Sequence, residues 1–242
     1  FKGNFMNELF LGILSFLTST VTGVVGIGGG MMLIAILPSF LPLNALIPVH
    51  GLTQMSSNLS RAVFGYKDVQ YEVIPKFLLG SAIGIGIFAG ILNVISLEYV
   101  PLFIGAYILL SLWSEKFNEK IKRYESYFLA GFFQTGLSMV VGATGPLTMT
   151  LLLKDYGDKD KVVATGAALM SITHILKVFV FMYFGFVFFD YLGVIVAMII
   201  GAVAGSWAGT QLRDKIGGKK FVLILKVFLS VLAIHVMVKV FI

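Results

Sequence analysis

Two apolar segments of the chain each carry a row of polar and basic side chains at helical spacing. Residues three or four apart share one face of a helix, so each row would line one side of its segment. The rows are His50, Gln54, Ser57, Asn58 and Arg61 in the first segment and Thr173, His174 and Lys177 in the second. Hydrogen-bond donors and positive charges on one face can bind an anion, and a histidine can also exchange a proton near neutral pH.

Each of these charged or titratable residues also has a structural explanation. A Lys or Arg inside a membrane costs roughly 3 kcal/mol or more, so Arg61 and Lys177 are functional candidates by default. If they lie near a helix end, their side chains instead extend to the lipid headgroups. His50 and His174 are either proton carriers or hydrogen-bonded packing residues. The sequence leaves these alternatives open.

The composition of the whole chain indicates a multi-pass membrane protein. Of its 242 residues, 58% are hydrophobic and only 12% are charged, whereas a soluble domain is typically about 25% charged. The net charge of +6 comes from basic residues in short clusters between apolar blocks, a pattern typical of membrane orientation. We therefore expect a lipid bilayer, and no nucleic acid, around this chain.

Eight apolar blocks can be distinguished, and two of them are interrupted by glycines. The blocks cover residues 9–37, 43–64, 73–92, 97–113, 127–153, 162–184, 191–212 and 221–241. The first and the fifth exceed the roughly 20 residues of one crossing and contain GIGGG (26–30) and GATGP (142–146). Glycine within a helix costs about 1 kcal/mol relative to alanine, so each interruption predicts a helix break. The helix restarting near Met31 or Leu147 would present free N–H groups to an anion.

Glycines can instead allow two helices to pack closely. The packing explanation is favoured for Gly80, Gly84, Gly90, Gly201, Gly205 and Gly209. The binding explanation is favoured for the two interruptions, because each is paired with one of the polar rows.

The two interruptions belong to an internal repeat with a shift of 116 residues. The shift aligns VGIGGGMML (25–33) with VGATGPLTM (141–149), and it places Arg61 on Lys177. The expected parts of this all-α membrane domain are a first repeat, residues 1–113, a cytoplasmic linker, residues 114–126, and a second repeat, residues 127–242.

The basic residues indicate how the blocks cross the membrane. If every block crossed once, the sixteen basic residues other than Arg61 and Lys177 would divide equally between the two sides, contrary to the positive-inside rule. If the first and fifth blocks each enter and leave on one side, only Lys2 and Lys239 lie outside. The loops then predicted to be cytoplasmic are 114–126, 154–161 and 213–220.

Each half would thus contain one broken or re-entrant hairpin and three transmembrane helices. Because three crossings are an odd number, the two halves form an inverted tandem repeat, an architecture of transporters whose substrate site lies near the membrane midplane. For the first block, two short spans remain the alternative to a re-entrant hairpin.

Other kinds of chemistry have little support in the sequence. There is no cysteine, no HExxH and no GxSxG, so we expect no catalytic residue, metal site or cofactor. No block contains an evident intramembrane carboxylate, which favours coupling to protons, or no coupling, over coupling to sodium. His50 and His174 are the possible proton-coupling residues.

The segment GVVGIGGGMMLIAIL (23–37), the polar helix after it and the later GATGP and ITHILKVFVF (172–181) together resemble the TauE/SafE sulfite exporter family. The resemblance extends from about Gly12 to Ile242. It implies a transporter of sulfur-containing anions, small organic sulfonates or carboxylates in a bacterial or archaeal cytoplasmic membrane. The family's glycine motifs correspond to Gly26, Gly28, Gly29 and Gly30 and to Gly142 and Gly145. The chain departs from the family pattern at Thr144 and Pro146, which replace glycines, and at His174, where the family often has Asn.

The sequence therefore predicts a secondary transporter, with export as the favoured direction, for a small anion such as sulfite, thiosulfate or an organosulfonate. The anion would bind at the midplane between the two glycine-rich breaks. The expected binding residues are Gly26, Gly28, Gly29, Gly30, Gln54, Ser57, Asn58, Arg61, Gly142, Thr144, Gly145, Thr173, His174 and Lys177. The alternatives are an anion channel with the same site, an intramembrane enzyme with His50 or His174 as a base, and a purely structural membrane subunit. The oligomeric state is left open.

Overall fold

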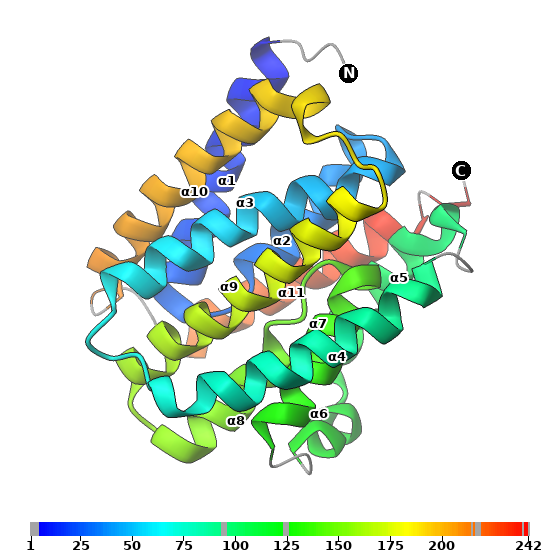
Figure 1. Ribbon diagram of the computed structural model, residues 1–242. Coiled ribbons are helices and arrows are strands. Elements are labelled where there is room, and N and C mark those ends of the chain that lie inside the picture. Colours follow the sequence, from blue (N-terminus) through cyan, green and yellow to red (C-terminus); the bar gives the residue numbers. More distant parts are fainter. Residues whose placement is uncertain are drawn as a thin grey trace.

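The computed structural model in Figure 1 describes residues 5–92, 96–122, 126–213, 215, 219–238 and 240–241. Over these residues the chain forms helices joined by short turns, and it contains no β-strand there. The predicted all-α fold is therefore confirmed. Lys2, Arg123 and Lys239 lie outside the described residues, as do parts of the expected 114–126 linker and of the 213–220 loop.

Each half begins with a pair of helices separated by a break that contains glycine. The pairs are α1 (Phe5–Val25) with α2 (Gly29–Ile36) and α7 (Tyr127–Val141) with α8 (Pro146–Tyr156). At the breaks Gly26, Gly28 and Gly142 have φ angles of +90°, +103° and +78°. L-residues with a Cβ rarely adopt this left-handed region, so the chain needs glycine at these positions to turn.

The remaining long α-helices follow in the same order in both halves, whereas the short 3-10 segments differ. In the first half they are η1 (Leu37–Ser39), α3 (Leu43–Phe64), η2 (Tyr71–Val73), α4 (Ile74–Leu92), η3 (Leu97–Tyr99) and α5 (Val100–Trp113). In the second half they are α9 (Lys159–Tyr183), η4 (Phe188–Tyr191), α10 (Leu192–Leu212) and α11 (Lys219–Val238). α6 (Glu115–Lys122) lies within the expected linker. The inverted orientation of the halves and the re-entrant path of the broken pairs stay predictions.

Helices from opposite halves form the most extensive contacts. α1 packs along α10, and α4 packs along α7, so each broken pair lies against a helix of the other half (Figure 1). Glycines bring these backbones together. A Cβ added to Gly84 would stand 2.2 Å from the Phe132 oxygen, and one added to Gly205 would stand 2.2 Å from the Phe16 oxygen. The packing explanation applies to these glycines but not to Gly90, where an added Cβ would meet no described atom within 4 Å.

α3 and α9 lie side by side across the middle of the molecule, and they bury both polar rows (Figure 1). The buried members are His50, Gln54, Ser57, Asn58 and Arg61 on α3 and Thr173, His174 and Lys177 on α9. The helical spacing read from the sequence thus places each row on one inward face, and the two faces meet at the centre of the fold.

The outer surface is largely apolar, which is the reverse of a water-soluble protein. Large apolar side chains are exposed on several helices, for example Tyr183, Phe189 and Ile224. Within the described ranges, four helical segments are long and apolar enough to cross a membrane; they are 5–25, 71–90, 159–183 and 188–212. α3 has a comparable length of 22 residues, but its buried polar row lowers its hydropathy. These features support a multi-pass membrane protein.

Candidate functional site

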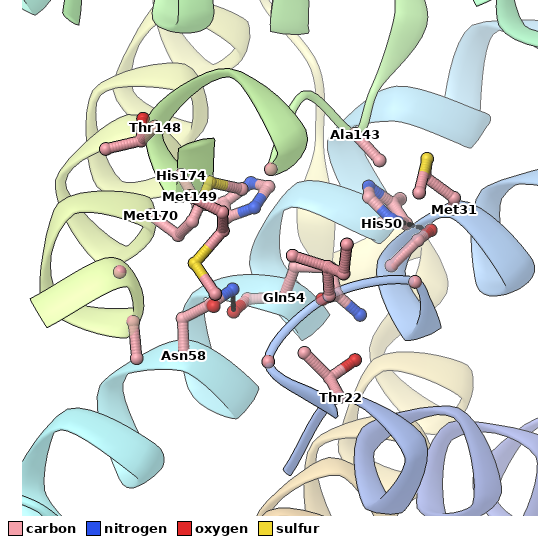
Figure 2. A pocket seen from close by; sticks show the side chains of 17 residues that line it. Thr22, Met31, His50, Gln54, Asn58, Ala143, Thr148, Met149, Met170 and His174 are labelled. Atoms are coloured by element: carbon pink, nitrogen blue, oxygen red, sulfur yellow. Dashed lines mark hydrogen bonds between the residues drawn. The ribbon is translucent and has the colours of Figure 1, made fainter. Parts of the chain in front are cut away.

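A small cavity lies between the two breaks, where they meet the middle of α3 and α9 (Figure 2). Its walls come from the α1–α2 break, from α3, from the start of α8 and from α9. The free space is about 40 Å³, which is room for a few water-sized molecules or a small ion. Residues from both halves of the chain therefore build one site.

Both breaks bring the amino-terminal turn of a helix to this cavity. Gly28 precedes α2 and Gly145 precedes α8, and both residues line the cavity. Glycine has no side chain that could cap the following turn; at α8, Pro146 has no N–H and the Thr148 N–H donates to Gln134 Oε1 at 3.2 Å. Because the amino end of a helix carries a partial positive charge, the two helix ends favour a negatively charged ligand.

α3 contributes three polar side chains to the cavity wall. Figure 2 shows His50, Gln54 and Asn58 reaching the cavity from this helix. The Nε2 atom of His50 lies 2.9 Å from the Gly30 oxygen, so α3 is tied to the first turn of α2. Asn58 donates from Nδ2 to the backbone carbonyl oxygen of Gln54 at 2.7 Å. These bonds fix the side chains, as a preorganised binding site requires.

Arg61 lies directly behind Asn58, one turn further along α3. It donates from Nη2 to Asn58 Oδ1, and only 3% of the residue is exposed. Two other nitrogens of its guanidinium, Nε and Nη1, are buried without a hydrogen-bond partner in the described part of the chain. A buried guanidinium with unpaired donors is costly, and these two nitrogens remain unpaired in the described part of the chain.

Lys177 occupies the equivalent position on α9 but is already engaged. Its ammonium donates to the Gly142 oxygen at 2.8 Å and to the Ser138 oxygen at 3.4 Å. Both oxygens lie at the carboxyl end of α7, where the helix carries a partial negative charge. Lys177 therefore caps α7, and its buried side chain does not extend to the surface of the protein.

The structure brings eight of the predicted site residues to the cavity wall. They are Gly26, Gly28, Gly30, His50, Gln54, Asn58, Gly145 and His174. The remaining predicted residues, which lie behind the wall, are Gly29, Ser57, Arg61, Gly142, Thr144, Thr173 and Lys177.

Several of the residues behind the wall have structural partners. The Ser57 hydroxyl bonds the hydroxyls of Ser19 and Ser206, each at 3.0 Å, and so joins α3 to α1 and α10. The Thr144 hydroxyl donates to the backbone carbonyl oxygen of Gln134 at 2.9 Å within the α7–α8 pair. A Cβ added to Gly29 would stand only 1.8 Å from the oxygen of Thr18, so this glycine allows α2 to pack on α1.

Sequence reasoning missed other residues of the site. Thr22 and Thr148 line the cavity, together with Met31, Met149 and Met170. Gln134 accepts from the Thr148 hydroxyl and from the Thr148 amide at 3.2 Å, and it thereby holds the first turn of α8. Thr22 precedes Gly26 by one helical turn, a spacing that could have indicated it. The Met residues carry no comparable signal, because Met is common in any apolar segment.

The buried charged residues next to the cavity are both cations, Arg61 and Lys177, and neither lines its wall. No Asp or Glu lines the cavity, and none is buried among the residues that the structure describes. The charges of Arg61 and Lys177 therefore have no buried carboxylate to neutralise them there. In the same part of the chain, no three His, Cys, Asp or Glu side chains come together in a way that could hold a metal ion. The arrangement provides hydrogen-bond donors, with two buried cations beside them.

Comparison with known protein families gives one match. A family model described as sulfite exporter TauE/SafE matches residues 11–236, which include both breaks, both polar rows and nearly all of the cavity-forming helices. Searches of curated proteins and of solved structures gave no significant match.

Proposed function

Because the chain belongs to the TauE/SafE sulfite exporter family, we propose that its central cavity binds a small anion, such as sulfite, thiosulfate or a small organosulfonate, for export. The single observation that carries this proposal is the buried positive charge. Arg61 and Lys177 lie beside the cavity and no carboxylate is buried with them in the described residues. A protein tolerates such charges most easily if a ligand supplies the negative partner.

In this proposal the anion contacts both halves of the chain. The first turn of α2 donates backbone N–H groups, the amino end of α8 adds the partial positive charge of its helix dipole, and Asn58 and Gln54 contribute amide groups from α3. Arg61 adds a positive charge behind Asn58, to whose Oδ1 it donates from Nη2. The free space of about 40 Å³ favours a compact anion such as sulfite over a long organosulfonate.

The repeated order of helices supports a transport cycle in which the site opens to either side of the membrane. If the halves are inverted relative to each other, the two breaks approach the anion from opposite directions, as in other transporters with inverted repeats. The basic segments 114–126, 154–161 and 213–220 would then share the cytoplasmic side. α6, in the first of these segments, contacts α8, which ends in the second.

Flux measurements on purified protein in proteoliposomes test this proposal. We expect saturable counterflow of radiolabelled sulfite or thiosulfate, competed by unlabelled anion and absent from empty liposomes. An ohmic current without counterflow would instead indicate an anion channel. Neither flux nor current, with any of sulfite, thiosulfate, taurine or sulfoacetate, would contradict transport and leave an enzyme or a structural subunit.

A further inference from the structure

We propose that the anion binds together with a proton and that Nδ1 of His50 is the atom that takes the proton up. This inference rests on the proposed function, because it requires an anion in the cavity. It adds to that function a second transported ion, the proton, and names the one atom that accepts it.

The hydrogen bond to Gly30 determines which nitrogen of His50 carries hydrogen. A backbone carbonyl has no hydrogen to give, so the 2.9 Å contact requires that Nε2–H donates to the Gly30 oxygen. In the neutral imidazole the other nitrogen, Nδ1, then presents only a lone pair. Nδ1 is buried and has no hydrogen-bond partner in the part of the chain that the structure describes.

The Nδ1 atom also lies beside the α7–α8 break. A Cβ added to Gly142 would stand 3.7 Å from it and 2.8 Å from Cγ1 of Ile34, so the lack of a side chain at Gly142 lets the backbone of the break approach the ring. His50 lines the cavity and extends between the two breaks (Figure 2). A ligand in the cavity would therefore lie beside the imidazole ring of His50.

A neutral His50 is a poor partner for an anion, because its lone pair repels the oxygen atoms of the ligand. Protonation of Nδ1 converts this acceptor into a charged donor and allows a charge-assisted hydrogen bond. The proton comes from water, it forms an N–H bond at Nδ1, and no bond of the anion breaks. If the proton travels with the anion, each transported anion carries one negative charge fewer across the membrane.

The titratable and charged groups nearest His50 come from α9. They are His174, whose ring lies edge-on at 5.9 Å between centroids, and Lys177, whose ammonium bonds the Gly142 oxygen beside Nδ1. On α3 itself, Arg61 lies three helical turns further along. The cavity-lining residues of α2 and of the α7–α8 break contain no titratable side chain. A positive charge added at Nδ1 would therefore lie near the Lys177 ammonium, which bonds the Gly142 oxygen, and a bound anion would compensate it.

Calorimetric titration tests the inference directly. The probes are sulfate, thiosulfate and methanesulfonate, which stay deprotonated near neutral pH, titrated into detergent-solubilised protein in two buffers of different ionisation enthalpy. We expect uptake of about one proton per bound anion. In the pH range where His50 is neutral in the empty site and protonated in the occupied site, the anion affinity should fall about tenfold for each pH unit of increase. Binding without proton uptake would overturn the inference but not the proposed function. No binding of any probe would overturn both.

Histidine variants assign the proton to its atom. His50→Gln keeps an N–H group for the Gly30 oxygen but cannot be protonated, so we expect binding without proton uptake and without the pH dependence. The third histidine, His235, is exposed on α11, and His235→Gln is the matched control that should behave as the wild type. Wild-type proton uptake by His50→Gln, or loss of uptake only in His174→Gln, would contradict the assignment. The wild-type titration alone decides whether a proton is bound, even if a variant does not fold.

Discussion

Arg61 and Lys177 are aligned by the predicted repeat, yet different cations cap the helices that precede the two breaks. Lys177 caps α7 through the Gly142 and Ser138 oxygens. At α1 that role belongs to Arg213, which donates from Nε to the Gly23 oxygen at 3.0 Å and pairs with Asp160 at 2.6 Å. Arg61 is thereby left with free donors.

The partners of these cations predict a ranking of anion affinities. Arg61→Gln should weaken anion binding by about ten- to a hundredfold, since a hydrogen bond to a charged group contributes about 1.5–3 kcal/mol. Lys177→Gln should weaken it less, because that ammonium is already bonded to carbonyl oxygens. Arg61→Lys should recover only part of the loss, since lysine lacks the planar guanidinium fork.

Titration calorimetry with sulfite or thiosulfate measures this ranking. Lys226→Gln is the control for a lost positive charge, because Lys226 lies on α11 beside Trp113 and does not line the cavity. Equal affinity of the Arg61→Gln variant and the wild type would remove Arg61 from the site.

Helical periodicity is the reason that His50, Gln54, Asn58 and His174 could be predicted as a group. A period of about 3.6 residues fixes which side chains share a face before any partner helix is known. The different roles of Arg61 and Lys177 could not be predicted in this way. They depend on which carbonyl oxygens each side chain meets, and that depends on how α7 and α1 pack in three dimensions.

The helix-helix contacts and the breaks place different demands on glycine. At the contacts between α1 and α10 and between α4 and α7, glycine is needed because a Cβ would enter the backbone of the neighbouring helix. At Gly26, Gly28 and Gly142 it is needed for the positive φ angle of the turn. Gly145 needs neither: its φ is −48°, and an added Cβ would meet no described atom within 4 Å.

Alanine at a helix contact should destabilise the fold. Gly205→Ala places a Cβ 2.2 Å from the Phe16 oxygen, so α1 and α10 must separate, and we expect a loss of about 1–3 kcal/mol. Gly86→Ala on α4 is the matched control, because it meets no described atom within 4 Å and gains up to about 1 kcal/mol of helix propensity. Thermal unfolding in detergent measures both. Equal stability of the two variants would contradict the packing assigned to Gly205.

Alanine at Gly145 should separate ligand binding from stability. Its methyl group would project beside the cavity without a clash, so we expect the stability to change by less than about 0.5 kcal/mol. The same methyl group would crowd an anion at the first turn of α8, and loss of one charge-assisted bond of about 1.5 kcal/mol weakens binding roughly tenfold. Unfolding and anion titration of the same preparation test both statements. Unchanged affinity would place the anion away from α8.

At the scale of the whole molecule, the fold encloses polar residues and exposes apolar ones. The composition was sufficient to predict this, since a chain with 12% charged residues cannot cover itself with polar surface. The pairing of α1 with α10 could not be predicted, because an apolar helix with small residues can pack closely against many other helices and its sequence does not specify which one. The orientation of the helices in the membrane depends on basic loops and requires a separate test.

Cysteine labelling tests the orientation, and the chain has no cysteine of its own. Glu115→Cys and Lys161→Cys replace exposed residues on either side of the α7–α8 pair, and both should react only from the cytoplasmic side. Tyr183→Cys, at the other end of α9 and 87% exposed, is the internal control and should react only from outside. Labelling of positions 115 and 161 from opposite sides would contradict the inverted repeat.

The contact between α1 and α10 has a consequence for the biosynthesis of the protein. The chain between Val25 and Leu192 takes roughly ten to thirty seconds to synthesise, so α1 leaves the ribosome long before its neighbour exists. During that time its close-packing positions, Gly12 and Gly23, face lipid or temporary neighbours. α4 and α7 emerge within a few seconds of each other and can pair early. The first helix to be synthesised is therefore among the last to pack against its native neighbour. Until α10 is made, α1 can pair with the wrong helix.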